Sequence, residues 1–178
     1  MTAPSELDEV ARVAAGLTSL GLRPVLVGGM ALVLLGSRRI TRDFDFVIPR
    51  PEGRLDELIE LFYERGFELA SKVDPAGDIV ATIDNPRVAS IRLRLDAPAS
   101  AYFWHLTKRL RIDLLFDFPV IATELASRAR DVTIRGRVFH IAAEADLLRM
   151  KKIARRDRSF PGDAEDIKFL ETRRGTRK

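Results

Sequence analysis

A short apolar segment that runs directly into two glycines restricts the fold of this chain more than any other feature. Residues 24–27 are expected to form a buried strand, and Gly28-Gly29 then turns the chain into a short apolar helix that ends at Gly36. The rest of the chain mixes further helices and strands. Together these patterns indicate an α/β (α+β) fold.

The hydrophobic pattern predicts the other elements in the same way. A first helix is expected between an N-cap at Ser5 and a stop at Gly21. Further helices are predicted over residues 51–65, 119–128, 144–158 and 163–173. Strands are predicted over residues 43–48, 67–73, 79–83, 90–96 and 110–118, with a hairpin over 132–141, while residues 99–107 fit no single pattern.

The 178 residues suffice for one compact domain. We expect residues 1–142 to form a core in which helices flank a mixed β-sheet, and residues 143–178 to form a small helical extension of the same domain with a basic tail. The sequence contains no apolar stretch of the roughly 20 residues that span a membrane, no visible signal peptide and no cysteine. We therefore expect a cytoplasmic protein without membrane attachment.

Two aspartates on a predicted strand carry the strongest chemical signal. The alternation over residues 43–48 places Asp43 and Asp45 on one face, about 6 to 7 Å apart along the strand. Such a pair of carboxylates can hold one divalent cation or two, and Mg²⁺ is the hard cation that best suits oxygen ligands, with Mn²⁺ as the alternative. The preceding Gly28 and Gly29 allow the backbone to approach a phosphate closely.

The combination of these two features resembles a known superfamily. A strand, Gly-Gly, an apolar helix, Gly36, an arginine, Thr41 and then Asp-x-Asp follow one another within about 20 residues. This order is similar to that of the DNA polymerase β-type nucleotidyltransferases. The resemblance implies that the glycines hold a nucleoside triphosphate, that the aspartates ligate Mg²⁺, and that a nucleoside monophosphate is transferred with release of pyrophosphate. Superfamily members often have serine at the position of Gly29.

The same resemblance implies a third carboxylate on a later apolar strand. Residues 110–116 offer Asp113, and Asp117 is a competitor on the same strand face. We favour Asp113 because it lies deeper in the strand, where a buried carboxylate needs a compensating cation. Asp113 would complete the metal site with Asp43 and Asp45 and help to activate the acceptor hydroxyl.

The C-terminal segment is similar to the AbiEii/MenT-type nucleotidyltransferase toxins. Residues 143–154 are followed by a basic turn and by residues 162–170, which contain Asp163 and Asp166. The resemblance implies that Lys151 binds the triphosphate and that Asp163 or Asp166 orients Lys151 or an arginine. It also implies tRNA as the acceptor and an antitoxin as a partner protein. Gly162 departs from the pattern, which has a lysine or arginine there.

Basic residues leave the nature of the acceptor open. Arg39 and Thr41 precede the aspartate strand and are further candidates for nucleotide binding. The cations between residues 149 and 158 favour a polyanion such as RNA and argue against a cationic aminoglycoside. Aromatic residues 103–105 and the nearby Arg111 are a candidate RNA-stacking surface, although Trp104 suits packing better. The alternatives are transfer to a protein or a small molecule, and a non-catalytic module that binds nucleotide or RNA.

Overall fold

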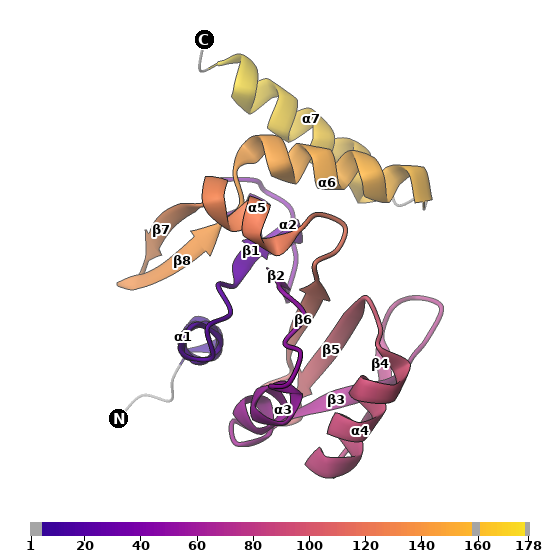
Figure 1. Ribbon diagram of the computed structural model, residues 1–178. Helices are drawn as coiled ribbons and strands as arrows, with labels where there is room; N and C mark the ends of the chain where they lie inside the picture. Colours follow the sequence, from indigo (N-terminus) through magenta and orange to yellow (C-terminus); the bar gives the residue numbers. More distant parts are fainter. Residues whose placement is uncertain (1–4, 158–160, 177–178) are drawn as a thin grey trace.

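A mixed eight-stranded sheet forms the framework of the chain (Figure 1). This computed structural model describes residues 5–157 and 161–176. The strand order is β4-β3-β5-β6-β2-β1-β8-β7. The strands are β1 (Val25–Val27), β2 (Asp43–Ile48), β3 (Phe67–Val73), β4 (Ile79–Ile83), β5 (Ser100–His105), β6 (Leu110–Phe116), β7 (Arg130–Ile134) and β8 (Arg137–Ile141). The helices are α1 (Glu6–Ser19), α2 (Gly28–Leu34), α3 (Leu55–Tyr63), α4 (Pro86–Asp96), α5 (Ala122–Arg128), α6 (Glu144–Asp157) and α7 (Pro161–Gly175).

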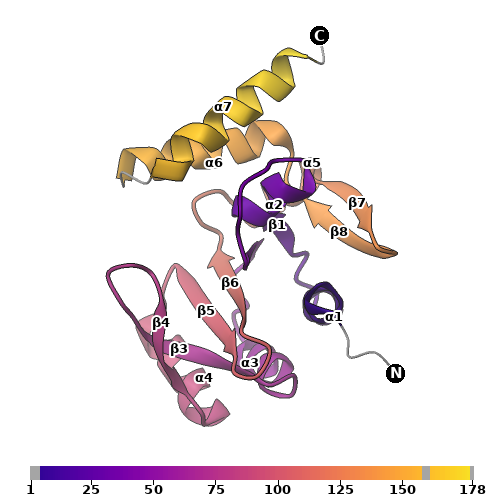
Figure 2. The same cartoon turned by 180° about the vertical axis from the view of Figure 1, so that it is seen from behind.

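The helices gather at two ends of the sheet. α6 and α7 pack side by side at one end, and α3 and α4 lie together at the opposite end, as both views show (Figures 1 and 2). α2 follows β1 without a connecting loop, because Gly28 is the first residue of the helix. The arrangement confirms the predicted α/β (α+β) fold, whereas the proposed boundary after residue 142 stays a prediction.

Strands β5, β6 and β2 divide their side chains cleanly between two faces. Phe103 of β5 lies opposite Ile112 of β6, which in turn lies opposite Phe44 of β2, and all three side chains are buried. On this apolar face the rings of Phe62 and Phe103 stack with their centroids 3.8 Å apart. Because successive residues of a strand point to opposite faces, the residues between these apolar ones share the other face.

One predicted element is wrong. Residues 90–96 were expected to be a strand, but they belong to the helix α4. The side-chain oxygen of Asn85 accepts hydrogen bonds from the backbone N–H of Arg87 (2.9 Å) and Val88 (3.3 Å) and so caps this helix. The apolar residues at alternate positions suggested a strand, yet Ala89 and Leu93 are four apart and bury one helix face.

Smaller differences concern the ends of elements. The ambiguous residues 99–107 contain β5, and α3 and α5 begin later than predicted, at Leu55 and Ala122. The expected break at residues 161–162 belongs to the first turn of α7. The predicted end of the preceding helix at Arg158 lies outside the described residues. The hairpin of β7 and β8 is confirmed, with Arg135 and Gly136 both at positive φ (50° and 75°) as a tight two-residue turn requires.

Candidate active site

Three carboxylates share the polar face of β2 and β6. The two strands are parallel, and their register places Asp45 directly opposite Asp113 and Asp43 opposite Arg111. Asp113 is buried (6% exposed), and Asp43 and Asp45 are partly buried. The structure thus brings together the three aspartates that the sequence predicted as metal ligands.

Burial and neighbouring negative charge shift the pKa values of Asp45 and Asp113. Burial raises the pKa of Asp45 to about 7, with further contributions from the negative charges of Asp113 and Asp43. The positive charges of Arg111 and Lys151 act in the opposite direction. Burial also raises the pKa of Asp113, against the effect of its hydrogen bonds with Arg111. The group therefore carries negative charge that a divalent cation would neutralise, and its oxygen donors are of the kind that Mg²⁺ prefers.

Arg111 holds the third carboxylate, a contact that the sequence analysis missed. Its Nε donates to Oδ1 of Asp113 (2.7 Å) and its Nη2 to Oδ2 (3.0 Å), while Nη1 donates to the carbonyl oxygen of Gly77 (2.6 Å). The guanidinium carbon lies 4.7 Å from the centre of the Tyr102 ring. The spacing of Arg111 and Asp113 on one strand could have revealed the pair, because residues two apart share a face.

The pairing of Arg111 with Asp113 determines how a metal would be held. As the side chains stand, no three carboxylates or histidines within residues 5–157 and 161–176 converge on a common metal position. Both oxygens of Asp113 are engaged by Arg111. Donor type and charge fit a divalent cation, and ligation by Asp113 requires that at least one of its oxygens leaves the guanidinium.

The two glycines are packed against functional side chains. Gly28 has a φ of +68°, and a Cβ there would lie 2.1 Å from an oxygen of Asp45. A Cβ on Gly29 would lie 2.9 Å from the guanidinium carbon of Arg39. The end of the Arg39 side chain thus occupies the space beside Gly29, where a longer side chain would require the guanidinium to move.

A second group of charged residues is formed by α6, α7 and the loop before β2. Lys151 Nζ lies 3.1 Å from Oδ1 of Asp163 and 2.8 Å from Oδ2 of Asp166. Arg39 donates to the same oxygen of Asp166. Asp163 and Asp166 are almost completely buried (1% and 3% exposed). The two carboxylates therefore fix two cations, and Lys151 is near enough to Asp45 to affect its pKa.

The remaining candidates lie at the margin of this arrangement. Asp117 has a φ of 50° and follows β6; its Oδ1 accepts from the backbone N–H of Ala122 (2.8 Å) and thereby caps α5. It lies outside the row formed by Asp45 and Asp113, so the geometry favours Asp113 as the third carboxylate. Thr41 is partly buried two residues before β2.

Comparison with known proteins identifies the fold. No family model and no curated protein matches this sequence. Among solved structures, the antibiotic-resistance factor ANT(2'')-Ia is similar with a TM-score of 0.59 and 14% identity over 97% of this chain and 85% of that one. The lincosamide antibiotic adenylyltransferase LnuA in its lincomycin-bound form matches with a TM-score of 0.57 and 13% identity over 92% and 94%.

A third similar structure is an antigenic nucleotidyltransferase-like protein from Paracoccidioides brasiliensis. Its TM-score is 0.55 at 16% identity, over 91% of this chain and 74% of that one. At such low identities the likeness shows that this chain has the nucleotidyltransferase fold. Within the described residues, no helix is long and apolar enough to cross a membrane.

Proposed function

We propose that this chain is a metal-dependent nucleotidyltransferase that transfers a nucleoside monophosphate from a nucleoside triphosphate to an acceptor hydroxyl. The observation that carries the proposal is the direct pairing of Asp45 with Asp113 on neighbouring strands, beside Asp43 and against Gly28. The acceptor oxygen forms a bond to the α-phosphorus, the bond to the bridging oxygen breaks, and pyrophosphate leaves. The proton of the hydroxyl passes to Asp113, the carboxylate that the family resemblance assigns to activation of the acceptor.

The carboxylate row is assigned to metal binding. Asp43, Asp45 and Asp113 would hold Mg²⁺, with Mn²⁺ as the alternative, and the ion would supply positive charge to the reacting and leaving phosphate oxygens. Arg111 would keep Asp113 in place until a metal ion binds, because it donates two hydrogen bonds to that carboxylate.

Residues around the glycine turn are assigned to the triphosphate. Because neither Gly28 nor Gly29 carries a side chain, a phosphate could approach their backbone closely once the adjoining Arg39 side chain turns toward it. Arg39 and Lys151 would bind phosphate oxygens, and we also assign Thr41, two residues after Arg39, to the triphosphate. Asp163 and Asp166 act through these cations, because each contacts Lys151 and Asp166 also contacts Arg39.

RNA, and tRNA in particular, is the acceptor that we favour, with a role as a toxin that an antitoxin protein controls inside the cytoplasm. Exposed cations on α6, including Lys152, Arg155 and Arg156, support this choice because they suit a polyanion. A small molecule is the second candidate. It is favoured by the similarity to LnuA, which is a lincosamide antibiotic adenylyltransferase.

Radiolabelled transfer tests the proposal. The protein is incubated with Mg²⁺, each labelled triphosphate, and either bulk tRNA or a panel of small hydroxyl compounds. We expect a labelled acceptor that is absent with the Asp45→Asn variant. Calorimetry with triphosphate and Mg²⁺ separates the non-catalytic alternative: binding that is equal in the wild type and in Asp45→Asn, without any product, would contradict the proposed enzyme.

A further inference from the structure

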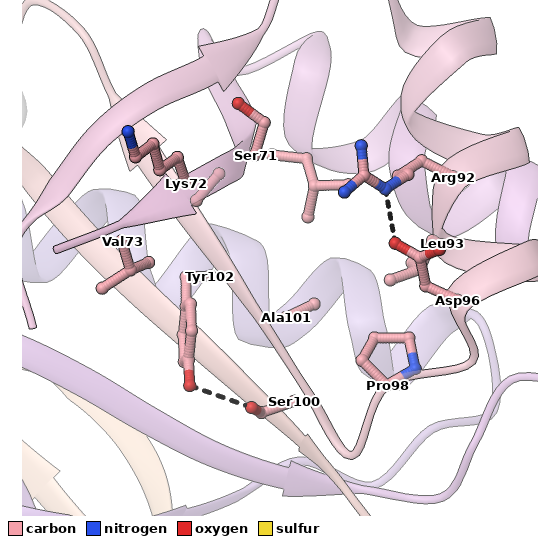
Figure 3. A pocket seen from close by; sticks show the side chains of 12 residues that line it. Ser71, Lys72, Val73, Arg92, Leu93, Asp96, Pro98, Ser100, Ala101 and Tyr102 are labelled. Atoms are coloured by element: carbon pink, nitrogen blue, oxygen red, sulfur yellow. Dashed lines mark hydrogen bonds and ion pairs between the residues drawn. The ribbon is translucent and has the colours of Figure 1, made fainter. Parts of the chain in front are cut away.

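A cavity beside the carboxylate row arises where two strands of the sheet diverge. β3 pairs with β5 only at residues 67–69, and beyond that point β3 pairs with β4 alone. The resulting cavity of about 190 Å³ is lined by β3, by the first half of β5 and by the C-terminal part of α4 (Figure 3). None of the residues that line this cavity has a role in the proposed function so far.

Tyr102 is the residue that the cavity shares with the surroundings of Asp113. Tyr102 lines the cavity and lies directly opposite Asp113 in the register of β5 and β6, so the two side chains share a face. Arg111 lies over the Tyr102 ring while it holds Asp113, and it also contacts Gly77 in the turn between β3 and β4. Of the side chains around Asp113, Tyr102 therefore also lines the cavity, and Arg111 packs on its ring.

Charge and size restrict what the cavity can bind. Its lining contains two cations, Lys72 and Arg92, and one carboxylate, Asp96, which is already paired with Arg92. Among the described residues, no carboxylate forms an ion pair with the exposed Lys72. A volume of about 190 Å³ holds one ring, whereas pockets for drug-sized ligands begin at about 300 Å³. An anionic, ring-sized group fits both properties, and a polycation does not.

The polar groups of the cavity suit a sugar. The hydroxyl of Ser100 lies 3.0 Å from the hydroxyl of Tyr102, and Figure 3 shows both on β5, with Lys72 across the cavity on β3. An aromatic ring with a hydroxyl can pack against the C–H groups of a sugar and hydrogen-bond its hydroxyls at the same time.

We propose that this cavity is the acceptor subsite and that it binds a single sugar ring carrying a phosphate, which Lys72 recognises while a sugar hydroxyl faces Asp113. The inference rests on the proposed function and narrows its acceptor to a sugar phosphate. The 3′ end of an RNA and a small phosphorylated sugar share this chemistry, and polycationic aminoglycosides lack it.

Equilibrium binding tests the subsite without any need for turnover. Ribose 5-phosphate and a short RNA with a free 3′ hydroxyl are titrated calorimetrically into the wild type, into Lys72→Glu and into the control Lys168→Glu, which reverses an exposed lysine on α7. We expect Lys72→Glu to weaken at least one probe tenfold or more and Lys168→Glu to change it less than twofold. Tighter binding of the RNA identifies an RNA end as the source, and equal binding identifies a small sugar phosphate.

Three results would overturn the inference: binding of neither probe to the wild type, equal effects of the two substitutions, or tobramycin binding as tightly as ribose 5-phosphate. Steady-state transfer adds a second readout. Lys72→Glu should raise the KM for the acceptor tenfold or more while kcat and the KM for the triphosphate stay within twofold. Lys72-dependent binding of a probe with no transfer of label to any acceptor would instead contradict the proposed enzyme and leave a sugar-phosphate site.

Discussion

Two groups of charged residues meet at the candidate active site, and they differ in their balance of charge. The sheet group on β2 and β6 combines three carboxylates with a single guanidinium, that of Arg111. The helix group on α6, α7 and the loop before β2 combines two carboxylates with two cations. These residues are Asp163, Asp166, Arg39 and Lys151. The first group has excess negative charge and suits a metal ion. The second is balanced, and under the proposed function its carboxylates hold cations for a phosphate.

This difference predicts that the sheet group matters for chemistry more than for stability. Asp45→Asn should lower the rate of transfer by roughly a thousandfold, equivalent to about 4 kcal/mol of transition-state stabilisation. The metal-free protein should keep its stability or gain some, because one of three crowded carboxylates is neutralised. Single-turnover transfer and urea unfolding measure the two effects. If Asp45→Asn retains activity within tenfold of the wild type, Asp45 is not a ligand of the catalytic metal.

The helix group should behave in the opposite way. Asp166→Ala leaves Arg39 and Lys151 without a shared buried partner, and breaking a buried ion pair from one side costs about 3 kcal/mol. We expect a loss of stability of that size, together with weaker triphosphate binding. Glu165→Ala, at an exposed neighbouring position on α7, is the matched control. If both variants unfold at the same urea concentration, the contacts of Asp166 contribute nothing to the stability of the folded protein.

The pH dependence of stability should follow the sheet group. Because the pKa of Asp45 is raised to about 7 in the folded protein, the native state binds more protons than the unfolded state between about pH 4 and pH 7. Stability of the metal-free protein should therefore fall as the pH rises through this window, by on the order of 4 kcal/mol. Urea unfolding in EDTA at several pH values measures the slope. Asp45→Asn should lose the part of this slope that comes from Asp45. Equal slopes in the wild type and the variant would contradict the prediction.

The two glycines provide the smallest and most direct comparison, since Gly28 borders the sheet group and Gly29 the helix group. Gly28→Ala combines a positive φ with contact against the Asp45 carboxylate and should cost about 2 kcal/mol or more. Gly29→Ala meets only the movable end of Arg39 and should cost about 1 kcal/mol or less, with a few-fold higher KM for the triphosphate. Thermal unfolding of both variants checks the order, and a reversed order would contradict it.

The sequence predicted the sheet group better than the helix group because strand periodicity is local. Two-residue spacing placed Asp43 and Asp45 on one face, and the apolar neighbours of Asp113 indicated a buried strand position. The contact between Asp45 and Asp113 depends on which strands are neighbours, and no local pattern determines that. Arg39 and Asp166 are 127 residues apart, and only the family resemblance suggested an arginine as a partner.

The mistaken strand at residues 90–96 has a similar cause. Apolar residues at alternate positions match a strand, and Ile91 and Leu95 in fact lie exposed on α4 while Leu93 is buried. The decisive local signal is Asn85 followed by Pro86, a helix cap and a first-turn proline. The divergence of β3 from β5, which creates the cavity, leaves no mark in the sequence that could have been recognised.

The position of Asp166 on α7, after the other residues of the candidate site in the sequence, has a consequence for biosynthesis. A nascent chain that has emerged only as far as α6 already contains the aspartates of β2 and β6, the glycine turn and both phosphate-side cations. Those cations obtain their fixing carboxylates only when α7 has been synthesised and has folded back against α6. Under the proposed function, a chain translated only as far as α6 would therefore lack a fixed triphosphate site.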